Sequence, residues 1–514
     1  MAERILVAVL FAGAAIISGI TLLDAIQPND EGLMLQAAAR VADGQIPYSD
    51  FWWFYPPGQP YLLGGLWELF GPSLLTWRIL RVLCDGAVAL LVWLLARQGG
   101  ASDRLAIAAW LMAALAMAYP SGPHPFPLTL AFCLGALLLM EDRPATAGVL
   151  AGLAAVWRIE FAAYLGLGVL LAYALRPGPR DDRVRAALRF AGSAIAVAFV
   201  LYLPVVAAAG VGDSFDLLIR YPLEDFSDYQ SLPFPLDYDG PLNTSSIGGF
   251  FSDSAENLLV FYLPLALVIG LAGSLVALGL RFERGRWWQV PAAVFAVGMA
   301  HYLVTRPDVF HTAPLAVMVA VLATWAIAER HEEARVHPLR IVALGLAVLA
   351  VAYATVEGLD RRWLEARADR VALDVPVADG VRVRKDTARQ LERVVGYVRR
   401  HTRPGDPIYV ATRRADLVTA GAPLLYVLAE RPNPTRYDIA APGVVTTESV
   451  QREIARDLER KRVRTVVRWT SPASAAPEPN KAGESSGVTL LDDYLAGAYR
   501  RVRSFGDYVV LERR

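Results

Sequence analysis

The sequence is poor in the residues that build disulfide frameworks and metal centres. It has 2 cysteines and 6 histidines in 514 residues. Cys84 and Cys133 each lie inside an apolar run, so no disulfide framework is expected. No spacing of Asp, Glu and His is diagnostic of a metal ligand set, although such residues near one another could hold a divalent ion. No cofactor is therefore predicted, and a divalent metal stays open.

Net charge is lacking as well, since 50 basic residues balance 50 acidic ones. Lysine is scarce, because all basic residues except Lys385, Lys461 and Lys481 are arginines. Hydrophobic residues make up 55% of the chain, and the mean hydropathy is +0.36. Soluble globular proteins rarely reach that value, so the composition predicts a polytopic membrane protein.

Hydrophobic runs that are long enough to cross a bilayer, or nearly so, occur about eleven times. They cover residues 5–23, 74–97, 103–119, 125–141, 144–157, 160–175, 187–209, 257–281, 288–304, 312–328 and 339–356. The first run is too long for a signal-peptide core and no small-residue cleavage site follows it, so an uncleaved anchor is expected. These runs exclude a soluble enzyme and a nucleic-acid-binding protein.

The distribution of arginine predicts the orientation of the chain. With eleven spans and the N-terminus inside, fifteen arginines fall on cytoplasmic segments and four fall in outer loops. The fifteen are Arg4, Arg97, Arg104, Arg143, Arg176, Arg180, Arg183, Arg185, Arg189, Arg281, Arg284, Arg286, Arg330, Arg335 and Arg340, and the four are Arg40, Arg158, Arg220 and Arg306. We therefore expect the N-terminus inside and the C-terminus outside the cytoplasmic (inner) membrane.

The stretch 27–60 follows the first span and is expected to emerge at the outer membrane surface, within an outer loop 24–73. It begins with the adjacent acids Asp30 and Glu31. Leu33, Ala37 and Val41 then recur at helical spacing, and a run of aromatic residues follows. Aromatic rings of this kind suit the headgroup level. Two interpretations remain: a loop that lies on the bilayer, or a catalytic loop that presents a carboxylate to a lipid-linked substrate.

Two further outer segments are predicted. The loop 210–256 is acidic and rich in aromatics and prolines, which fits either a solvated loop or a lid that binds a sugar acceptor. After about residue 357 the composition becomes mixed and charged. Helices near 387–400, 449–462 and 490–499 alternate with strands at 407–411, 463–469 and 508–511, which predicts a small extracytoplasmic α/β domain at 357–514. That domain either supports or selects the acceptor, or is a structural cap.

The predicted topology brings ionisable side chains that are far apart in the sequence to one level of the outer face. They are Asp30, Glu31, Arg78, Arg81, Asp85, His124, Arg158, Glu160, His301, Arg306, Asp308 and His311. Ionisable groups within a membrane region are functional candidates. The middle of the predicted bundle shows no acidic relay of the kind that an ion-coupled transporter needs. The pattern therefore favours an outer-face enzyme.

These residue types suit a donor in which a sugar is linked through phosphate to a polyprenyl chain. Arginine binds phosphate through paired charge-assisted hydrogen bonds, and Arg158, Arg306, Arg81 and His311 are predicted to bind the donor phosphate. The acceptor hydroxyl must lose its proton as it attacks the anomeric carbon. Asp30 is the predicted base.

The other predicted site residues have supporting roles. Glu31 is expected to orient Asp30 or the acceptor, because adjacent residues of one helical turn point in different directions. Candidate substrate-binding residues are His124, Glu160, Asp308 and Tyr55.

The motifs resemble those of a known superfamily. N-D-E-G after the first span, then G-Q-I-P-Y-S-D and Y-P-P-G-Q-P-Y, resemble the first periplasmic loop of the C-type (GT-C) membrane glycosyltransferases. That superfamily contains protein O-mannosyltransferases, aminoarabinose transferases and actinobacterial arabinosyltransferases. R-x-E at Arg158 and R-P-D-x-x-H at Arg306 are also similar. The resemblance covers residues 1–356 and implies an inverting transfer from a polyprenyl-phosphate sugar, with Asp30 at the catalytic position.

One departure from the superfamily bears on the mechanism. Several of its members carry a second acid in the next outer loop, where this chain has His124. Two other functions remain open besides the transferase: a lipid-linked glycan transporter or flippase, and a non-catalytic assembly protein of the cell envelope. The acceptor (glycan, lipid or protein) is not indicated by the sequence.

Overall fold

The computed structural model of the chain describes residues 2–118, 125–233, 265–266, 268–270, 272–273, 284–307, 309–328 and 369–514. The predicted span 339–356 and most of the span 257–281 lie outside these residues. So do the candidate residues His124 and Asp308.

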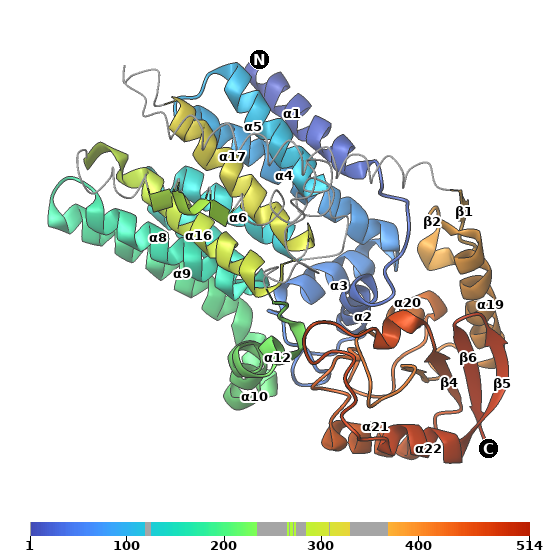
Figure 1. The fold of residues 1–514 in the computed structure, drawn as a ribbon. Coiled ribbons are helices and arrows are strands. Elements are labelled where there is room, and N and C mark those ends of the chain that lie inside the picture. Colours follow the sequence, from blue (N-terminus) through green and yellow to red (C-terminus); the bar gives the residue numbers. More distant parts are fainter. Residues whose placement is uncertain are drawn as a thin grey trace, which may run out of the picture.

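Most of the apolar runs form the helices of one bundle, which is seen in Figure 1 as a layered array of long helices. The bundle contains α1 (Ala2–Gly19), α4 (Leu74–Gln98), α5 (Asp103–Ala118), α6 (Phe126–Leu139), α7 (Pro144–Trp157), α8 (Ile159–Leu175), α9 (Arg180–Ala209), α16 (Val290–Thr305) and α17 (Thr312–Ala328). Each coincides with a predicted span. Helix α4 packs on α1, α5 and α6, while α9 packs on α7 and α16 on α8. The predicted α-helical fold is confirmed for these segments.

The bundle exposes apolar side chains on the surface of α9. On α9 the side chains of Leu188, Ile195, Phe199 and Val200 are more than 60% exposed. An apolar face of this extent suits lipid rather than water. Among the described residues, α4 and α9 are long and apolar enough to cross a membrane on their own, and several other apolar helices are shorter. The total of eleven spans remains a prediction.

One end of the bundle is covered by the segment that follows α1. Helix α2 (Asp30–Ala42) carries the predicted apolar stripe of Leu33, Ala37 and Val41, and Asp43 follows its last residue. Gly44 follows with φ of 80°, a conformation that glycine adopts without strain. Helix α3 (Gly58–Phe70) packs against α2. It was not predicted, because its start lies within the aromatic and proline-rich run.

The predicted outer loop 210–256 begins with a series of short helical turns. These are α10 (Val211–Phe215), a π-helical turn (Asp216–Arg220), α11 (Tyr221–Glu224) and α12 (Phe226–Gln230). Residues 234–256 lie outside the described residues. Short 3₁₀ turns occur elsewhere at Arg284–Gln289, Val309–His311, Pro376–Ala378 and Pro472–Ala475.

The C-terminal segment contains the predicted helices and strands. Its helices are α19 (Lys385–His401), α20 (Leu424–Ala429), α21 (Glu448–Arg460) and α22 (Leu490–Ala498), and a small antiparallel pair joins β1 (Arg370–Ala372) to β2 (Arg382–Arg384). A four-stranded sheet has the order β3-β4-β6-β5, formed by β3 (Ile408–Ala411), β4 (Thr465–Trp469), β6 (Tyr508–Arg513) and β5 (Tyr499–Phe505). β3 and β4 are parallel, and β6 is antiparallel to both of its neighbours. Strand β5 was not predicted.

The C-terminal segment and the predicted outer loop 24–73 share one hydrophobic core. A single cluster of buried side chains joins Leu35, Trp53 and Leu63 of the outer loop to Val410 and Leu428 of the C-terminal segment. Figure 1 shows α20 lying beside α2, at the end of the bundle. The helix that carries Asp30 is therefore held from the C-terminal side as well as from the bundle.

The closest approach of these two parts occurs at Gly32. A methyl group on this residue would lie 2.1 Å from the backbone nitrogen of Leu424. Gly32→Ala is therefore expected to push α2 away from α20 and to lower the free energy of unfolding by about 1–3 kcal/mol. Gly65→Ala on α3 is the control, because a methyl group there meets nothing within 4 Å. Thermal unfolding of the detergent-solubilised protein compares them, and equal melting temperatures would contradict the close packing.

Candidate functional site

The two adjacent acids at the start of α2 face different surroundings. Asp30 is exposed, whereas Glu31 is 3% exposed. Their neighbours differ as well: Nδ2 of Asn29 donates a hydrogen bond of 2.8 Å to Oδ1 of Asp30, and Glu31 faces the bundle. The first turn of a helix also favours a carboxylate, because its backbone N–H groups point toward that end. Of these two carboxylates, therefore, only that of Asp30 is open to solvent.

Asn29 connects Asp30 to the C-terminal segment. Its Oδ1 accepts a hydrogen bond of 2.9 Å from the backbone nitrogen of Gly421, while its Nδ2 donates to Asp30. The backbone nitrogen of Leu424 also donates to the carbonyl oxygen of Pro28, at 3.1 Å. The orientation of the Asp30 carboxylate therefore depends on a contact that lies almost four hundred residues away in the sequence.

Glu31 forms a buried ion pair with the start of α4. Arg78 Nε and Nη2 donate to the two carboxylate oxygens at 2.7 and 2.9 Å. The same guanidinium also donates to the carbonyl oxygens of Leu22 and Ala25, at 3.0 and 2.7 Å. Glu31 thereby ties α2 to α4 and to the end of the first span.

Arg81 belongs to a second buried group inside the bundle. It is 3% exposed and its Nη1 lies 3.7 Å from Oδ2 of Asp85. Ser18 of α1 donates a hydrogen bond of 2.5 Å to the same oxygen. Arg81 thus helps to pair α1 with α4, one helical turn after Arg78.

Arg158 occupies the break between α7 and α8. Its backbone is extended, with φ of −150° and ψ of 103°, which turns the chain between the two helices. The guanidinium is largely buried and pairs with Glu160 at 2.5 Å. It also lies 5.7 Å from the ring centre of Tyr55 and 5.2 Å from that of Tyr302. Aromatic faces stabilise a cation in such positions.

Tyr55 is influenced by the charges of four predicted site residues. Burial raises the pKa of its hydroxyl to about 12, and the charges around it act in opposite directions. The positive charges of Arg158 and Arg306 lower this pKa, and the negative charges of Asp30 and Glu160 raise it. Its backbone oxygen accepts a 2.6 Å hydrogen bond from the Tyr48 hydroxyl. The Tyr55 hydroxyl is therefore neutral at physiological pH and able to donate a hydrogen bond.

Arg306 follows the last residue of α16 and reaches two other parts of the chain. Nη2 donates to Oε1 of Glu478 at 3.0 Å, and Nη1 lies 3.4 Å from Oε2 of the same carboxylate. Nη1 also donates to the carbonyl oxygen of Gln230 at the end of α12. Helix α16 of the bundle, the end of α12 and the C-terminal segment thus meet at this one guanidinium.

His311 lies beside the same group of rings. Its ring centre is 4.7 Å from that of Tyr302, the residue whose other neighbour is Arg158. His124 and Asp308, the other predicted substrate-binding residues on the outer face, are outside the described residues. The structure therefore brings Tyr55, Arg158 and Glu160 into contact, with His311 adjoining through Tyr302. The charges of Asp30 and Arg306 also act on Tyr55.

Asn29, Tyr302 and Glu478 of this region were not predicted, and Arg78 was named among the ionisable candidates but given no role. Arg78 has a sequence signal, since it lies at the same predicted outer level as Arg81. Asn29, Tyr302 and Glu478 have none, because each gains its role from a partner that is distant in the sequence.

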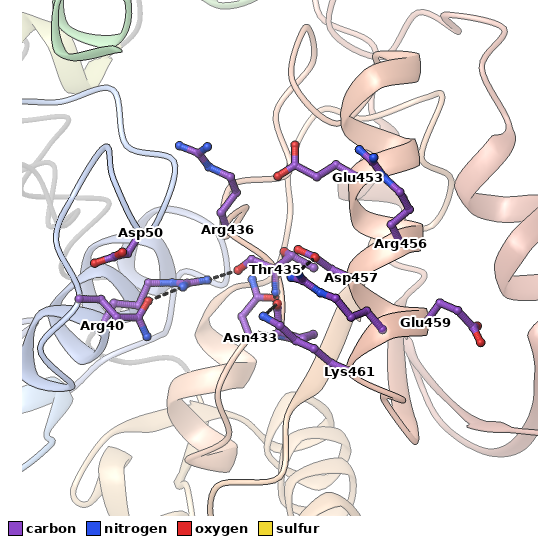
Figure 2. Close-up of a pocket in the computed structure, with 13 residues that line it drawn as sticks. Arg40, Asp50, Asn433, Thr435, Arg436, Glu453, Arg456, Asp457, Glu459 and Lys461 are labelled. Carbon is purple, nitrogen blue, oxygen red and sulfur yellow. Dashed lines mark hydrogen bonds and ion pairs between the residues drawn. The ribbon is translucent and has the colours of Figure 1, made fainter. Parts of the chain in front are cut away.

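A hollow of about 960 Å³ lies at the other end of α2, between that helix, segment 433–436 and α21. None of the predicted site residues lines it. Figure 2 shows Arg436, Glu453 and Arg456 along its rim. Arg40 in its wall comes ten residues after Asp30, which is about 15 Å along a helix. This hollow is therefore separate from the candidate site. Among the described residues, no group of three His, Cys, Asp or Glu side chains could hold a metal ion.

Comparison with known proteins identifies the fold. No family model and no curated protein matches the chain. ArnT from Cupriavidus metallidurans bound to undecaprenyl phosphate aligns with a TM-score of 0.53 and 15% identity, over 98% of this chain and 97% of that one. Its apo state gives 0.54 at the same identity and coverage. The arabinofuranosyltransferase AftD from Mycobacteria gives 0.51 and 18% identity, over 99% of this chain and 40% of AftD. The chain has the fold of the GT-C membrane glycosyltransferases, as its motifs predict.

Proposed function

We propose that this protein is a membrane glycosyltransferase that moves a sugar from a polyprenyl-phosphate-linked donor to an acceptor hydroxyl. The observation that supports the proposal is that the charges of Asp30, Arg158 and Arg306, from three separate segments, all act on the Tyr55 hydroxyl, with the Arg158 guanidinium 5.7 Å from the Tyr55 ring centre. A carboxylate and two arginines whose charges act on one neutral hydroxyl would supply both a base and an anion-binding site. The binding of undecaprenyl phosphate by ArnT supports the same class of donor.

Arg158 and Arg306 are the proposed ligands of the donor phosphate. Each guanidinium presents paired N–H donors that match two phosphate oxygens. Arg158 is held in place by Glu160 and by the rings of Tyr55 and Tyr302. The polyprenyl chain would then lie along the apolar surface of the bundle. Neutralisation of the phosphate makes it a good leaving group, so a strong general acid is not needed.

Asp30 is the proposed base. As the acceptor oxygen forms its bond to the anomeric carbon, the bond from that carbon to the phosphate oxygen breaks. The hydroxyl proton passes to the Asp30 carboxylate, and polyprenyl phosphate leaves. Attack from the side opposite the phosphate inverts the configuration at the anomeric carbon. The neutral Tyr55 hydroxyl can donate a hydrogen bond to the donor, and Asn29 orients the Asp30 carboxylate.

The reaction is proposed to take place at the outer face of the cytoplasmic membrane, with the N-terminus inside and the C-terminal segment outside. The arginine distribution supports this orientation. The exposed apolar surface of α9 supports insertion into lipid. A role in building the cell envelope follows, since lipid-linked sugars presented at that face are available to envelope acceptors.

The experiment that tests the function incubates the purified protein with a panel of polyprenyl-phosphate sugars. Consumption of one donor and appearance of free polyprenyl phosphate are expected. Reconstituted vesicles that move a lipid-linked sugar across the bilayer without cleaving its phosphate bond would instead indicate a transporter. A protein that neither binds nor consumes any donor would contradict the proposal.

Arg158→Lys tests the donor-phosphate site. Lysine keeps the charge but lacks the two-nitrogen fork, so the donor KM is expected to rise about 10- to 100-fold, corresponding to about 1.5–3 kcal/mol for hydrogen bonds to a charged group. Arg220→Lys is the matched control, because that side chain is exposed and pairs only weakly with Asp216. Steady-state kinetics with the identified donor measures both variants. Equal KM values would exclude Arg158 from phosphate binding.

A further inference from the structure

A loop of the C-terminal segment is attached to the proposed donor site. Within it, Asn480 Nδ2 donates to the carbonyl oxygen of Ser231 at 3.0 Å. The backbone nitrogen of Lys481 donates to the carbonyl oxygen of Asp228 at 3.2 Å, and its side chain pairs with the Asp228 carboxylate. These contacts hold the loop against the end of α12, beside Arg306. Glu478 is the residue that this attachment brings to Arg306.

The Glu478 carboxylate lies on the two terminal nitrogens of Arg306, an edge through which a guanidinium binds two phosphate oxygens. Its two oxygens face Nη1 and Nη2 of the guanidinium at 3.4 and 3.0 Å. Phosphate and carboxylate compete for this same fork, because both offer two oxygens at matching spacing. A phosphate oxygen pair and Glu478 therefore cannot both take the two terminal nitrogens.

We propose that Glu478 is a positioning residue that acts through Arg306: it pairs with the arginine when the donor site is empty and yields to the donor phosphate. This inference rests on the proposed function. After transfer, the leaving polyprenyl phosphate is in turn displaced as Glu478 pairs with Arg306 again. Glu478 thus favours product release at the expense of donor affinity.

The exposure of the Arg306–Glu478 ion pair limits how strongly Glu478 can change the affinity for the donor phosphate. The two side chains are 24% and 26% exposed, so solvent screens their attraction and the pair is easily exchanged. Loss of a partly exposed ion pair of this kind is expected to change the affinity for polyprenyl phosphate by about two- to fivefold. A pair of this strength can keep Arg306 oriented without blocking a phosphate ligand.

Glu478→Gln tests the inference in the full-length protein. It removes the charge and keeps the side-chain shape, so undecaprenyl phosphate is expected to bind about two- to fivefold more tightly. The donor KM should fall, and inhibition by polyprenyl phosphate should strengthen, by the same factor. Glu484→Gln is the matched control, because it removes an exposed acid from the same loop and should leave all three values unchanged.

A second pair of variants shows whether the effect passes through Arg306. In an Arg306→Ala background, Glu478→Gln should no longer change the affinity, since the competing site is gone. Weaker or unchanged binding by Glu478→Gln would overturn the inference while leaving the proposed function intact. If the wild-type protein binds no polyprenyl phosphate at all, the donor assignment and this inference both fail.

Discussion

Asp30→Asn is expected to lower the rate of sugar transfer by about 10²- to 10⁴-fold, the range that positioned proton transfer contributes. The amide cannot accept the hydroxyl proton, although it fills the same space. Donor binding should persist, because the proposed phosphate ligands lie on other segments. The exposed position of Asp30 predicts a small effect on stability, about 0.3–1 kcal/mol from the lost charge at the helix start. Transfer kinetics and the binding of polyprenyl phosphate are measured side by side.

Asp43→Asn provides the control for this measurement. Asp43 follows the last residue of the same helix, so the substitution makes the same chemical change at the other end of α2. Its activity should match that of the wild-type protein. A fully active Asp30→Asn protein would remove Asp30 as the base, and equal losses in both variants would point to a general disturbance of α2.

Many helices and strands of this protein could be predicted from the sequence, because each follows from the spacing of apolar residues within the element itself. The apolar stripe of α2 follows from the helical spacing of Leu33, Ala37 and Val41. The alternating pattern between 385 and 470 gave α19, β3, α21 and β4 close to their observed bounds. Strand β5 was missed, because it follows α22 directly, with no turn residues between them, and its arginines resemble an exposed helix face.

Only some of the residues that form the candidate site could be predicted from the sequence. Topology predicted that Asp30, Arg158 and Arg306 share one level, since charge bias orders the spans along the membrane normal. Topology gives no information on the position of a residue within the membrane plane. Arg81, for example, has the same predicted level as the other arginines, yet it pairs with Asp85 inside the bundle. The contributions of Gly421 and Glu478 depend on how the C-terminal segment docks, for which no sequence pattern exists.

Arg78→Ala is expected to lower the free energy of unfolding by about 3–5 kcal/mol, the cost of leaving one partner of a buried ion pair uncompensated. Glu31 is 3% exposed and has both of its carboxylate oxygens on Arg78. The carbonyl oxygens of Leu22 and Ala25 also lose a donor. Transfer activity should fall as well, because the start of α2 is no longer fixed to α4. Denaturation of the detergent-solubilised protein measures the loss.

Two comparisons separate the buried charge from other consequences of the substitution. Arg97→Ala removes an arginine whose ion pair with Asp103 is exposed, so its effect should stay below about 1 kcal/mol. The double variant Glu31→Gln with Arg78→Ala should be more stable than Arg78→Ala alone, because the uncompensated carboxylate has been removed. If the double variant is instead the less stable of the two, the hydrogen bond that Glu31 accepts from the backbone nitrogen of Gln27, at 3.4 Å, contributes more than its ion pair with Arg78. In that case its ion pair with Arg78 is not what holds the helix carrying Asp30 against the bundle.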